Sequence, residues 1–332
     1  MITYQALEVT QQEANVFATV TDRQLAEPKE NEVIVKIHYS SLNYKDALAT
    51  KQNGGVIRNY PMVPGIDLAG EILASHDPQW PIGEKVLVTG FGLGVTHPGG
   101  YSQAQVVPTD WLVRLPDCLS LKESMLFGTA GFTAALAVLA VIDDSVKKNA
   151  SIFVTGATGG VASIAIGLLA SLGYQSITAI TRKKETAQWL TACGATSICT
   201  PEEVLPEKKK RPLAKQTIDV LIDTVGGPFV SELLPSLSYG GKAALCGNAG
   251  GIQLETTVLP FILRSVQLIG IDSVAVPIDK RAAIWDFLAA HKELLTAIPQ
   301  TEIALSAIPA QADLLLAGTH SGRTLISIQV KK

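Results

Sequence analysis

The hydrophobic pattern of the chain changes character near residue 122. Before that point, short β-branched runs separated by proline and glycine predict strands at 33–40, 67–73 and 84–89. After it, the alanine-rich stretch 122–144 predicts a helix that is interrupted around 128–131. Several short strands joined by turns favour a barrel-like or sandwich domain for the first part of the chain.

From residue 152 onward, strand-like and helix-like segments alternate. The predicted strands are 152–155, 176–181, 218–223, 242–247 and 267–271, and the predicted helices are 163–172, 184–193 and 281–295. This alternation is typical of a parallel sheet with helices on both faces. The fold class is therefore α/β, a doubly wound parallel (Rossmann) sheet domain plus a β-rich domain. The terminal run 324–330 predicts a strand that returns to the first domain.

A glycine turn joins the first strand of this series to its helix, with the spacing Gly156-x-x-Gly159-x-x-Ala162 and a further glycine at Gly160. A pyrophosphate lies against backbone N–H groups at a helix N-terminus, where a side chain would block it. Alanine is tolerated at the last place of this fingerprint, where strand and helix pack closely. The turn predicts a dinucleotide site; the alternative is a tight turn without a ligand.

The end of the second strand carries Thr181, Arg182, Lys183 and Lys184. An enzyme for the unphosphorylated dinucleotide needs a carboxylate there, whereas a hydroxyl and two cations suit a 2′-phosphate. The sequence therefore predicts NADPH. The alternative is that these basic residues are only solvated, although a helix start disfavours cations.

Composition limits the other possibilities. The chain has 332 residues, 47% of them hydrophobic and 17% charged, which favours two folded domains. Its net charge of −3 supports neither a nucleic-acid nor a membrane partner. No basic stretch followed by an apolar core opens the chain, and we expect a cytoplasmic protein. Neither a zinc knuckle nor a disulfide framework is indicated by the four cysteines, Cys118, Cys193, Cys199 and Cys246.

The stretches 40–48, 64–70 and 83–86, together with the glycine turn, resemble the medium-chain dehydrogenase/reductase superfamily over essentially the whole chain. Zinc alcohol dehydrogenases of that superfamily have a cysteine in the first stretch and Gly-His-Glu in the second. This chain has Asn43-Tyr44-Lys45-Asp46 and Gly65-Ile66-Asp67, and it lacks the cysteine-rich lobe of the structural zinc. We therefore expect no metal, as in the zinc-free quinone oxidoreductases and enoyl reductases.

Five stretches narrow the resemblance to the bacterial acryloyl-CoA reductase group, whose members are also described as quinone oxidoreductases: 41–48, 57–61, 128–134, 260–264 and 322–325. The resemblance implies NADPH-dependent reduction of acryloyl-CoA to propionyl-CoA in a cytoplasmic homodimer. It also implies a GroES-like substrate and catalytic domain at 1–122, a Rossmann domain at 123–285, and a return to the catalytic domain at 286–332.

Carried over position by position, the resemblance places cofactor contacts along both parts of the chain. They are Tyr44, Thr158, Gly159, Gly160, Val161, Thr181, Arg182, Lys183, Asn248, Ile262, Ser273 and Arg323. Two departures matter: Ala162 stands where the family commonly has glycine, and residues 181–183 replace Ser-Gly-Arg.

Without a metal, the substrate carbonyl must be polarised by hydrogen bonds or by its own thioester electronics. Tyr44 is the candidate for positioning the nicotinamide or relaying a proton, and Asp46 for orienting Tyr44 or Lys45. The plain alternatives are a buried aromatic residue for Tyr44 and a helix N-cap for Asp46. The alternative functions are an NADPH:quinone oxidoreductase and a non-catalytic NADPH-binding sensor. In every case the partner is a small molecule, an enoyl thioester or a quinone in the two enzymes.

Overall fold

The structure is a computed structural model that describes residues 2–13, 15–205 and 211–328. The chain divides into two compact units. The first comprises Met1–Thr129, Ser273–Lys292 and Gln300–Lys332, and the second comprises Ala130–Asp272 and Glu293–Pro299. The expected limits at residues 122/123 and 285/286 fall inside the helices α2 (Leu121–Val141) and α8 (Ile278–Ala290). The boundary between the two units after Thr129 also falls inside α2, so the helical pattern of the sequence does not mark it.

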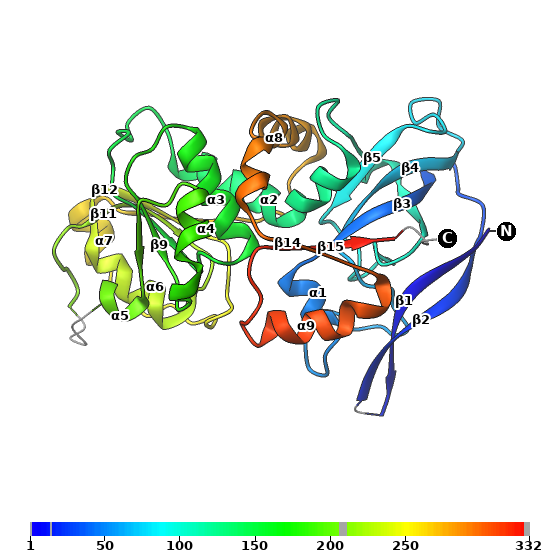
Figure 1. The fold of residues 1–332 in the computed structure, drawn as a ribbon, viewed down its shortest axis with the longest axis horizontal. Helices are drawn as coiled ribbons and strands as arrows, with labels where there is room; N and C mark the ends of the chain where they lie inside the picture. The colour runs from blue at the N-terminus through cyan, green and yellow to red at the C-terminus, as the bar shows by residue number, and fades with distance from the viewer. Residues whose placement is uncertain (1, 14, 206–210, 329–332) are drawn as a thin grey trace. The chain divides into compact units, whose positions relative to one another are not determined.

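The first unit is built on a mixed sheet with the strand order β14-β15-β3-β4-β5-β7, and β6 also pairs with β3 (Figure 1). The bounds are β3 Glu32–Leu42, β4 Asp67–Ser75, β5 Lys85–Thr89, β6 Ala104–Pro108, β7 Val113–Arg114, β14 Gln300–Ile303 and β15 Arg323–Ser327. The predicted return of the last strand is confirmed, because β15 pairs antiparallel with β3. The predicted end of that strand at residue 330 lies outside the described residues.

A two-stranded antiparallel ribbon precedes this sheet, formed by β1 (Ile2–Gln12) and β2 (Asn15–Leu25) (Figure 1). Within β1, Leu7 and Val9 are fully buried, and the Leu7 N–H donates to the carbonyl of Tyr101 at 2.8 Å. The hydrophobic pattern of this stretch predicts no particular strand. The ribbon docks through such long-range contacts, which local periodicity does not reveal.

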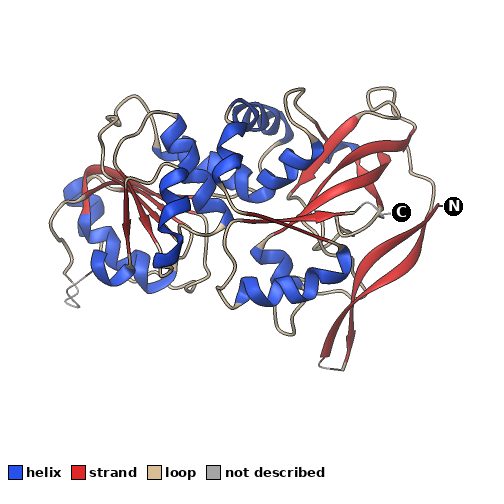
Figure 2. Ribbon diagram, viewed as in Figure 1, coloured by secondary structure: helices blue, strands red, loops and turns tan. Residues whose placement is uncertain are grey.

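The second unit contains a parallel sheet, drawn in red among blue helices in Figure 2. Its strand order is β10-β9-β8-β11-β12-β13. Its strands are β8 Ile152–Thr155, β9 Ile177–Ile180, β10 Ser197–Cys199, β11 Ile218–Asp223, β12 Leu237–Leu245 and β13 Gln267–Gly270. The order reverses between β8 and β11, which is the switch point of a doubly wound sheet. The predicted α/β fold class is confirmed.

The remaining helices include two that the sequence predicts, at 163–172 and 184–193, and others that it does not. They are α1 Tyr44–Ala49, α3 Gly160–Ser171, α4 Ala187–Ala192, α5 Pro201–Val204, α6 Gly227–Leu233, α7 Leu259–Arg264 and α9 Ile308–Leu316. The short 3-10 turns are η1 Thr109–Trp111, η2 Lys184–Thr186, η3 Leu234–Ser236, η4 Lys292–Ala297 and η5 Leu305–Ala307. The helix predicted at 163–172 begins earlier, because Gly159 is its N-cap. The helix predicted at 184–193 opens as η2 before it becomes α4.

Helix α2 is bent at Gly128, whose φ of 51° and ψ of −156° are not helical. The predicted interruption at 128–131 is thereby confirmed. Among the described residues, α2 is also the one helix whose length and composition would suffice to cross a membrane. However, 78% of the most apolar 18-residue stretch of α2 is buried in the fold. Core helices of soluble proteins can have the same length and apolar composition.

Arg281 fastens the segment Ser273–Lys292 to the rest of the first unit. Its side chain is fully buried, and its guanidinium lies 4.2 Å from the centre of the Phe91 ring. The guanidinium donates to the carbonyl oxygens of Thr89 at 2.8 Å, Val274 at 2.8 Å and Val276 at 3.0 Å. A planar fork with five donors satisfies several buried acceptors at once, which lysine cannot do.

Replacing Arg281 by methionine should therefore lower the free energy of unfolding by about 2–4 kcal/mol, because buried carbonyl oxygens lose their donors. Urea denaturation followed by tryptophan fluorescence measures the change. The exposed neighbour Lys280 provides the control, and Lys280→Met should stay within about 0.5 kcal/mol of the wild type. Equal stability of both variants would show that Arg281 fastens nothing.

Candidate active site

The glycine turn of the second unit has the geometry of an anion site. Gly156 has a φ of 61°, and a Cβ placed there would lie 2.5 Å from Thr224 Oγ1. Gly159 is the N-cap of α3, and no side chain caps that helix. The N-terminus of α3 therefore presents backbone N–H groups and its dipole without a competing side chain, as a pyrophosphate requires. Thr158, Gly159, Gly160 and Val161 all belong to this turn and the first turn of α3.

The carboxyl ends of three neighbouring strands meet beside that turn. Asp223, at the end of β11, is fully buried and accepts hydrogen bonds from Thr155 Oγ1 at 2.6 Å and from the Gly226 N–H at 2.7 Å. The Thr224 hydroxyl donates to the Thr155 carbonyl at 2.9 Å. Burial raises the pKa of Asp223 against the effect of its hydrogen bonds. Asn248 follows β12 at the same edge, where a Cβ on Gly226 would lie 3.2 Å from the Asn248 Cα.

Sequence reasoning missed Asp223 and Thr224. The available signal was a carboxylate and a hydroxyl directly after the apolar strand 218–222. These residues tie the carboxyl end of β8 to that of β11, directly before the glycine turn. Asn248 and Ile262 are exposed, Ile262 at 67% on α7. Neither side chain is part of the hydrophobic core. Both residues stay predictions as cofactor contacts.

The residues predicted for the 2′-phosphate lie together after β9. The Thr181 hydroxyl accepts from the Lys183 N–H at 3.0 Å, which turns the chain sharply at this point. Arg182 is exposed, and Lys183 is half-buried. Burial lowers the pKa of Lys183 against the opposing charge of Glu185, and the neighbouring Arg182 charge lowers it further. Lys184 pairs with Glu203 at 2.8 Å. Arg182 and Lys183 therefore form a pair of adjacent cations, and Lys184 is engaged elsewhere.

The first unit holds a buried cluster around Asp67, the first residue of β4. Its carboxylate accepts from Ser41 Oγ at 2.5 Å, from Asn43 Nδ2 at 2.7 Å, and from both the N–H, at 2.9 Å, and the hydroxyl of Thr129. Four donors facing two oxygens form the environment of a carboxylate anion. The cluster links β3, the start of α1 and the bend of α2. Its members, apart from Asn43 and Asp67, were not singled out in the sequence.

Gly128 is the point where this cluster excludes a side chain. A Cβ there would lie 2.5 Å from Asp67 Oδ2 and 2.6 Å from Ser41 Oγ. Together with its positive φ, this makes glycine the residue that the bend of α2 requires.

Asp46 is fully buried in α1 and accepts from the Asn43 N–H at 3.0 Å and from the Ile66 N–H at 2.9 Å. Burial, and next the charge of Asp67, raise the pKa of Asp46 from its ordinary 3.8 to about 7. The N-cap of α1 is Asn43, and Asp46 occupies the third helical position. The interpretation of Asp46 as an N-cap is therefore wrong, because its carboxylate instead returns to the Asn43 N–H as the far half of a capping box.

The hydrogen bonds of Asp46 do not orient the Tyr44 or Lys45 side chain directly. They hold the first turn of α1, on which both residues stand. Tyr44 is the first residue of α1 and is 38% exposed, so it is no buried core aromatic. Its phenol hydroxyl has no hydrogen-bond partner among the described residues, which leaves it available to a ligand.

Arg323 and Ser273 also belong to the first unit. Arg323 is only 3% exposed, and its guanidinium donates to the Leu126 carbonyl at 2.8 Å and to Asn43 Oδ1 at 3.3 Å. Burial lowers the pKa of Arg323 against the opposing charges of Asp67 and Asp46. This geometry directs the guanidinium to the buried cluster rather than to solvent. The carbonyl of Ser273 accepts from Arg281 at 3.2 Å.

A catalytic zinc does not fit these residues. The stretches that carry zinc ligands in related dehydrogenases have Asn43 and Ile66 in this chain, an amide and an alkyl group. The nearby carboxylates of Asp46 and Asp67 face N–H and O–H donors. Across the part of the chain that the structure describes, no three His, Cys, Asp or Glu side chains gather as a metal site.

Comparisons with known proteins agree with this geometry. The family model for the alcohol dehydrogenase GroES-like domain matches residues 29–117, and that for zinc-binding dehydrogenase matches residues 160–290. Acrylyl-CoA reductase AcuI of Ruegeria pomeroyi is 42% identical over 94% of this chain and 94% of its own. YhfP of Bacillus subtilis, provisionally named a quinone oxidoreductase, is 40% identical over 98% of this chain and 99% of its own.

Solved structures of two such proteins contain dinucleotides. The YhdH oxidoreductase of Salmonella enterica, in complex with NADP, has a TM-score of 0.92 and 43% identity, covering 98% of this chain and 100% of that one. The B. subtilis YhfP structure, with NAD bound, has a TM-score of 0.93 and 39% identity, covering 99% of this chain and 100% of that one. The chain therefore belongs to the medium-chain dehydrogenase/reductase superfamily, in the group of oxidoreductases that includes AcuI, YhdH and YhfP.

Proposed function

We propose that the protein is an NADPH-dependent reductase of the activated C=C bond of a short enoyl-CoA, and that it converts acryloyl-CoA to propionyl-CoA. The observation that carries this proposal is the 42% identity to an acrylyl-CoA reductase along 94% of both chains. The uncapped glycine turn at α3 and the cation pair after β9 support the choice of cofactor. A cytoplasmic homodimer completes the proposal, and sedimentation velocity measures its subunit number.

In the proposed reaction, bound NADPH supplies a hydride to the β-carbon of the thioester, and a proton then reaches the α-carbon. Residues of this chain bind, orient and protonate. The α3 N-terminus binds the pyrophosphate, and Arg182 and Lys183 bind the 2′-phosphate through charge-assisted hydrogen bonds. Tyr44 is our candidate for positioning the nicotinamide or relaying the proton, since it is 38% exposed at the start of α1.

The buried cluster around Asp67 holds the first turn of α1, which contains Tyr44. Asn43 caps α1 and donates to Asp67, while Asp46 accepts from the Asn43 N–H. Because these bonds are partly buried, they hold the first turn of α1 in place, and a catalytic group needs such placement. Asp46 is thus a positioning residue in this proposal, acting on Tyr44 through the backbone.

A quinone oxidoreductase is the second candidate, favoured by the provisional name of YhfP. The sites described above hold the dinucleotide in the same way for either acceptor. The third possibility, a non-catalytic NADPH sensor, would use the same dinucleotide site without turnover.

Purified protein should consume NADPH in the presence of acryloyl-CoA and form propionyl-CoA. Prior treatment with a chelator should leave the rate unchanged, because the residues present do not fit a zinc ion. Absorbance at 340 nm and mass spectrometry of the thioester provide the measurement. Turnover with a benzoquinone alone would support the second candidate, and NADPH binding without either turnover would support the sensor. Stoichiometric bound zinc, with activity lost on chelation, would overturn the metal-free mechanism.

Replacing Arg182 and Lys183 together by alanine should weaken NADPH binding by roughly 2–3 kcal/mol, or about 30- to 150-fold. NADH lacks the 2′-phosphate and should bind the double variant nearly as before. Lys184→Ala is the matched control, since Lys184 pairs with Glu203. Dissociation constants for both cofactors decide the question. An equal loss for NADPH and NADH, or a wild type that already prefers NADH, would refute the placement of residues 181–183.

The raised pKa of Asp46 predicts a dependence of stability on pH. Between the ordinary pKa of 3.8 and about 7, the folded protein holds a proton on Asp46 that the unfolded chain releases. Stability from this group therefore falls as pH rises, by up to about 1.4 kcal/mol per pH unit, and levels off above pH 7. Asp46→Asn cannot titrate, so the stability difference between wild type and variant should shrink from pH 5 to 7. A constant difference would mean that Asp46 is ionised throughout.

A further inference from the structure

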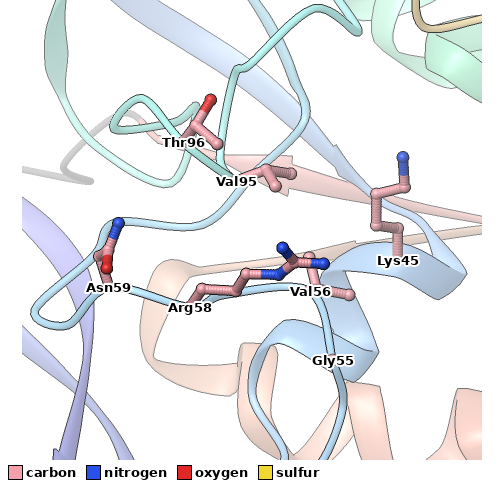
Figure 3. Close-up of a pocket in the computed structure, with 7 residues that line it drawn as sticks. All are labelled: Lys45, Gly55, Val56, Arg58, Asn59, Val95 and Thr96. Atoms are coloured by element: carbon pink, nitrogen blue, oxygen red, sulfur yellow. The ribbon is translucent and has the colours of Figure 1, made fainter.

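A pocket in the first unit lies outside the glycine turn and the buried cluster. It has a volume of about 370 Å³, within the range of small-molecule sites (Figure 3). Its lining comes from α1, from the loop after α1 and from the loop after β5, and consists of Lys45, Gly55, Val56, Arg58, Asn59, Val95 and Thr96.

The pocket carries two cations and no carboxylate in its lining. In Figure 3 the Arg58 side chain points toward the side on which Lys45 stands. Among the residues that the structure describes, neither Lys45 nor Arg58 has a hydrogen-bond or ion-pair partner. Lys51, in contrast, lies a few residues along the chain and pairs with Asp313 at 2.6 Å. The two pocket cations are therefore left for a ligand.

Lys45 does not stabilise the helix in which it stands. It occupies the second position of α1, and the positive end of a helix disfavours a cation. The network of Asn43 and Asp46 nevertheless fixes that turn, so that Lys45 is held at the edge of the pocket. Arg58 stands in an exposed loop, where a planar guanidinium can bind two oxygens of one phosphate.

We propose that this pocket binds a phosphate-bearing part of the substrate, with Lys45 and Arg58 contacting the phosphates of coenzyme A; this inference rests on the proposed function. The amide of Asn59 and the hydroxyl of Thr96 suit the amide groups of the pantetheine chain. Val56 and Val95 suit its methyl and methylene groups. The other source of the same chemistry is the phosphate of the dinucleotide, which the experiment separates.

The experiment compares wild type with the double variant Lys45→Ala/Arg58→Ala. Its substrates are acryloyl-CoA and the acryloyl thioester of N-acetylcysteamine, which lacks phosphates. KM for acryloyl-CoA should rise about 10- to 30-fold, as expected for the loss of two solvent-accessible charge-assisted contacts. KM for the truncated thioester and for NADPH should not change. The effect on acryloyl-CoA should fade at high salt, because added ions screen exposed charges.

Two controls sharpen the comparison. Lys29→Ala/Lys215→Ala removes two exposed cations that do not line the pocket and should leave every KM unchanged. Lys45→Arg keeps both charges and the Arg58 guanidinium, and it should retain most of the affinity for acryloyl-CoA. Isothermal titration with free coenzyme A measures binding without turnover, and the first double variant should bind it about 10- to 30-fold more weakly.

The outcomes separate this inference from the proposed function. Normal acryloyl-CoA turnover with an unchanged KM in the first double variant would overturn the pocket and leave the function standing. A rise in KM for NADPH instead would assign the two cations to the cofactor and overturn the inference. If the wild type reduces no enoyl-CoA, the function fails, and the titration with coenzyme A alone decides the pocket.

Discussion

The buried carboxylate of Asp67 is the constraint on which the first unit depends. It accepts hydrogen bonds from Ser41, Asn43 and Thr129, and these donors belong to a strand, a helix cap and the bend of α2. Burying a charge is costly unless every oxygen has a donor. The three segments must therefore meet at one point, and Gly128 must lack a side chain for them to do so. A buried polar group thus dictates the backbone around the candidate site.

The buried cluster determines the position of the exposed side of α1. Asn43 and Asp46 face inward in the first turn of α1, whereas Tyr44 and Lys45, between them, reach solvent or the pocket. Four consecutive residues therefore divide into an inner pair that holds the helix and an outer pair offered to ligands. A helix of six residues is not stable through its own hydrogen bonds alone. The inner pair stabilises α1, and α1 can therefore hold the side chains of Tyr44 and Lys45 in fixed positions.

Much of the second unit could be predicted from the sequence, because its signals are local. The strand 152–155, the glycine turn and the strand 218–223 follow one another along the chain in the order that is typical of a parallel sheet. The first unit was less accessible. Asp67 meets Ser41 and Thr129 across 26 and 62 residues of sequence, and no periodicity records such a meeting. For the same reason the ribbon of β1 and β2, and the pocket at Arg58, emerged only from the folded chain.

In the proposed function, the two pairs of cations bind two different phosphorylated ligands. Arg182 and Lys183 follow a strand of the second unit, and Lys45 and Arg58 line a pocket wholly within the first. In each place a neighbouring lysine, Lys184 or Lys51, is paired with a carboxylate and so withdrawn. Attraction to phosphate is strong but unselective, since any cation provides it. Ion pairing is therefore one source of selectivity, because it engages Lys184 with Glu203 and Lys51 with Asp313 before any ligand arrives.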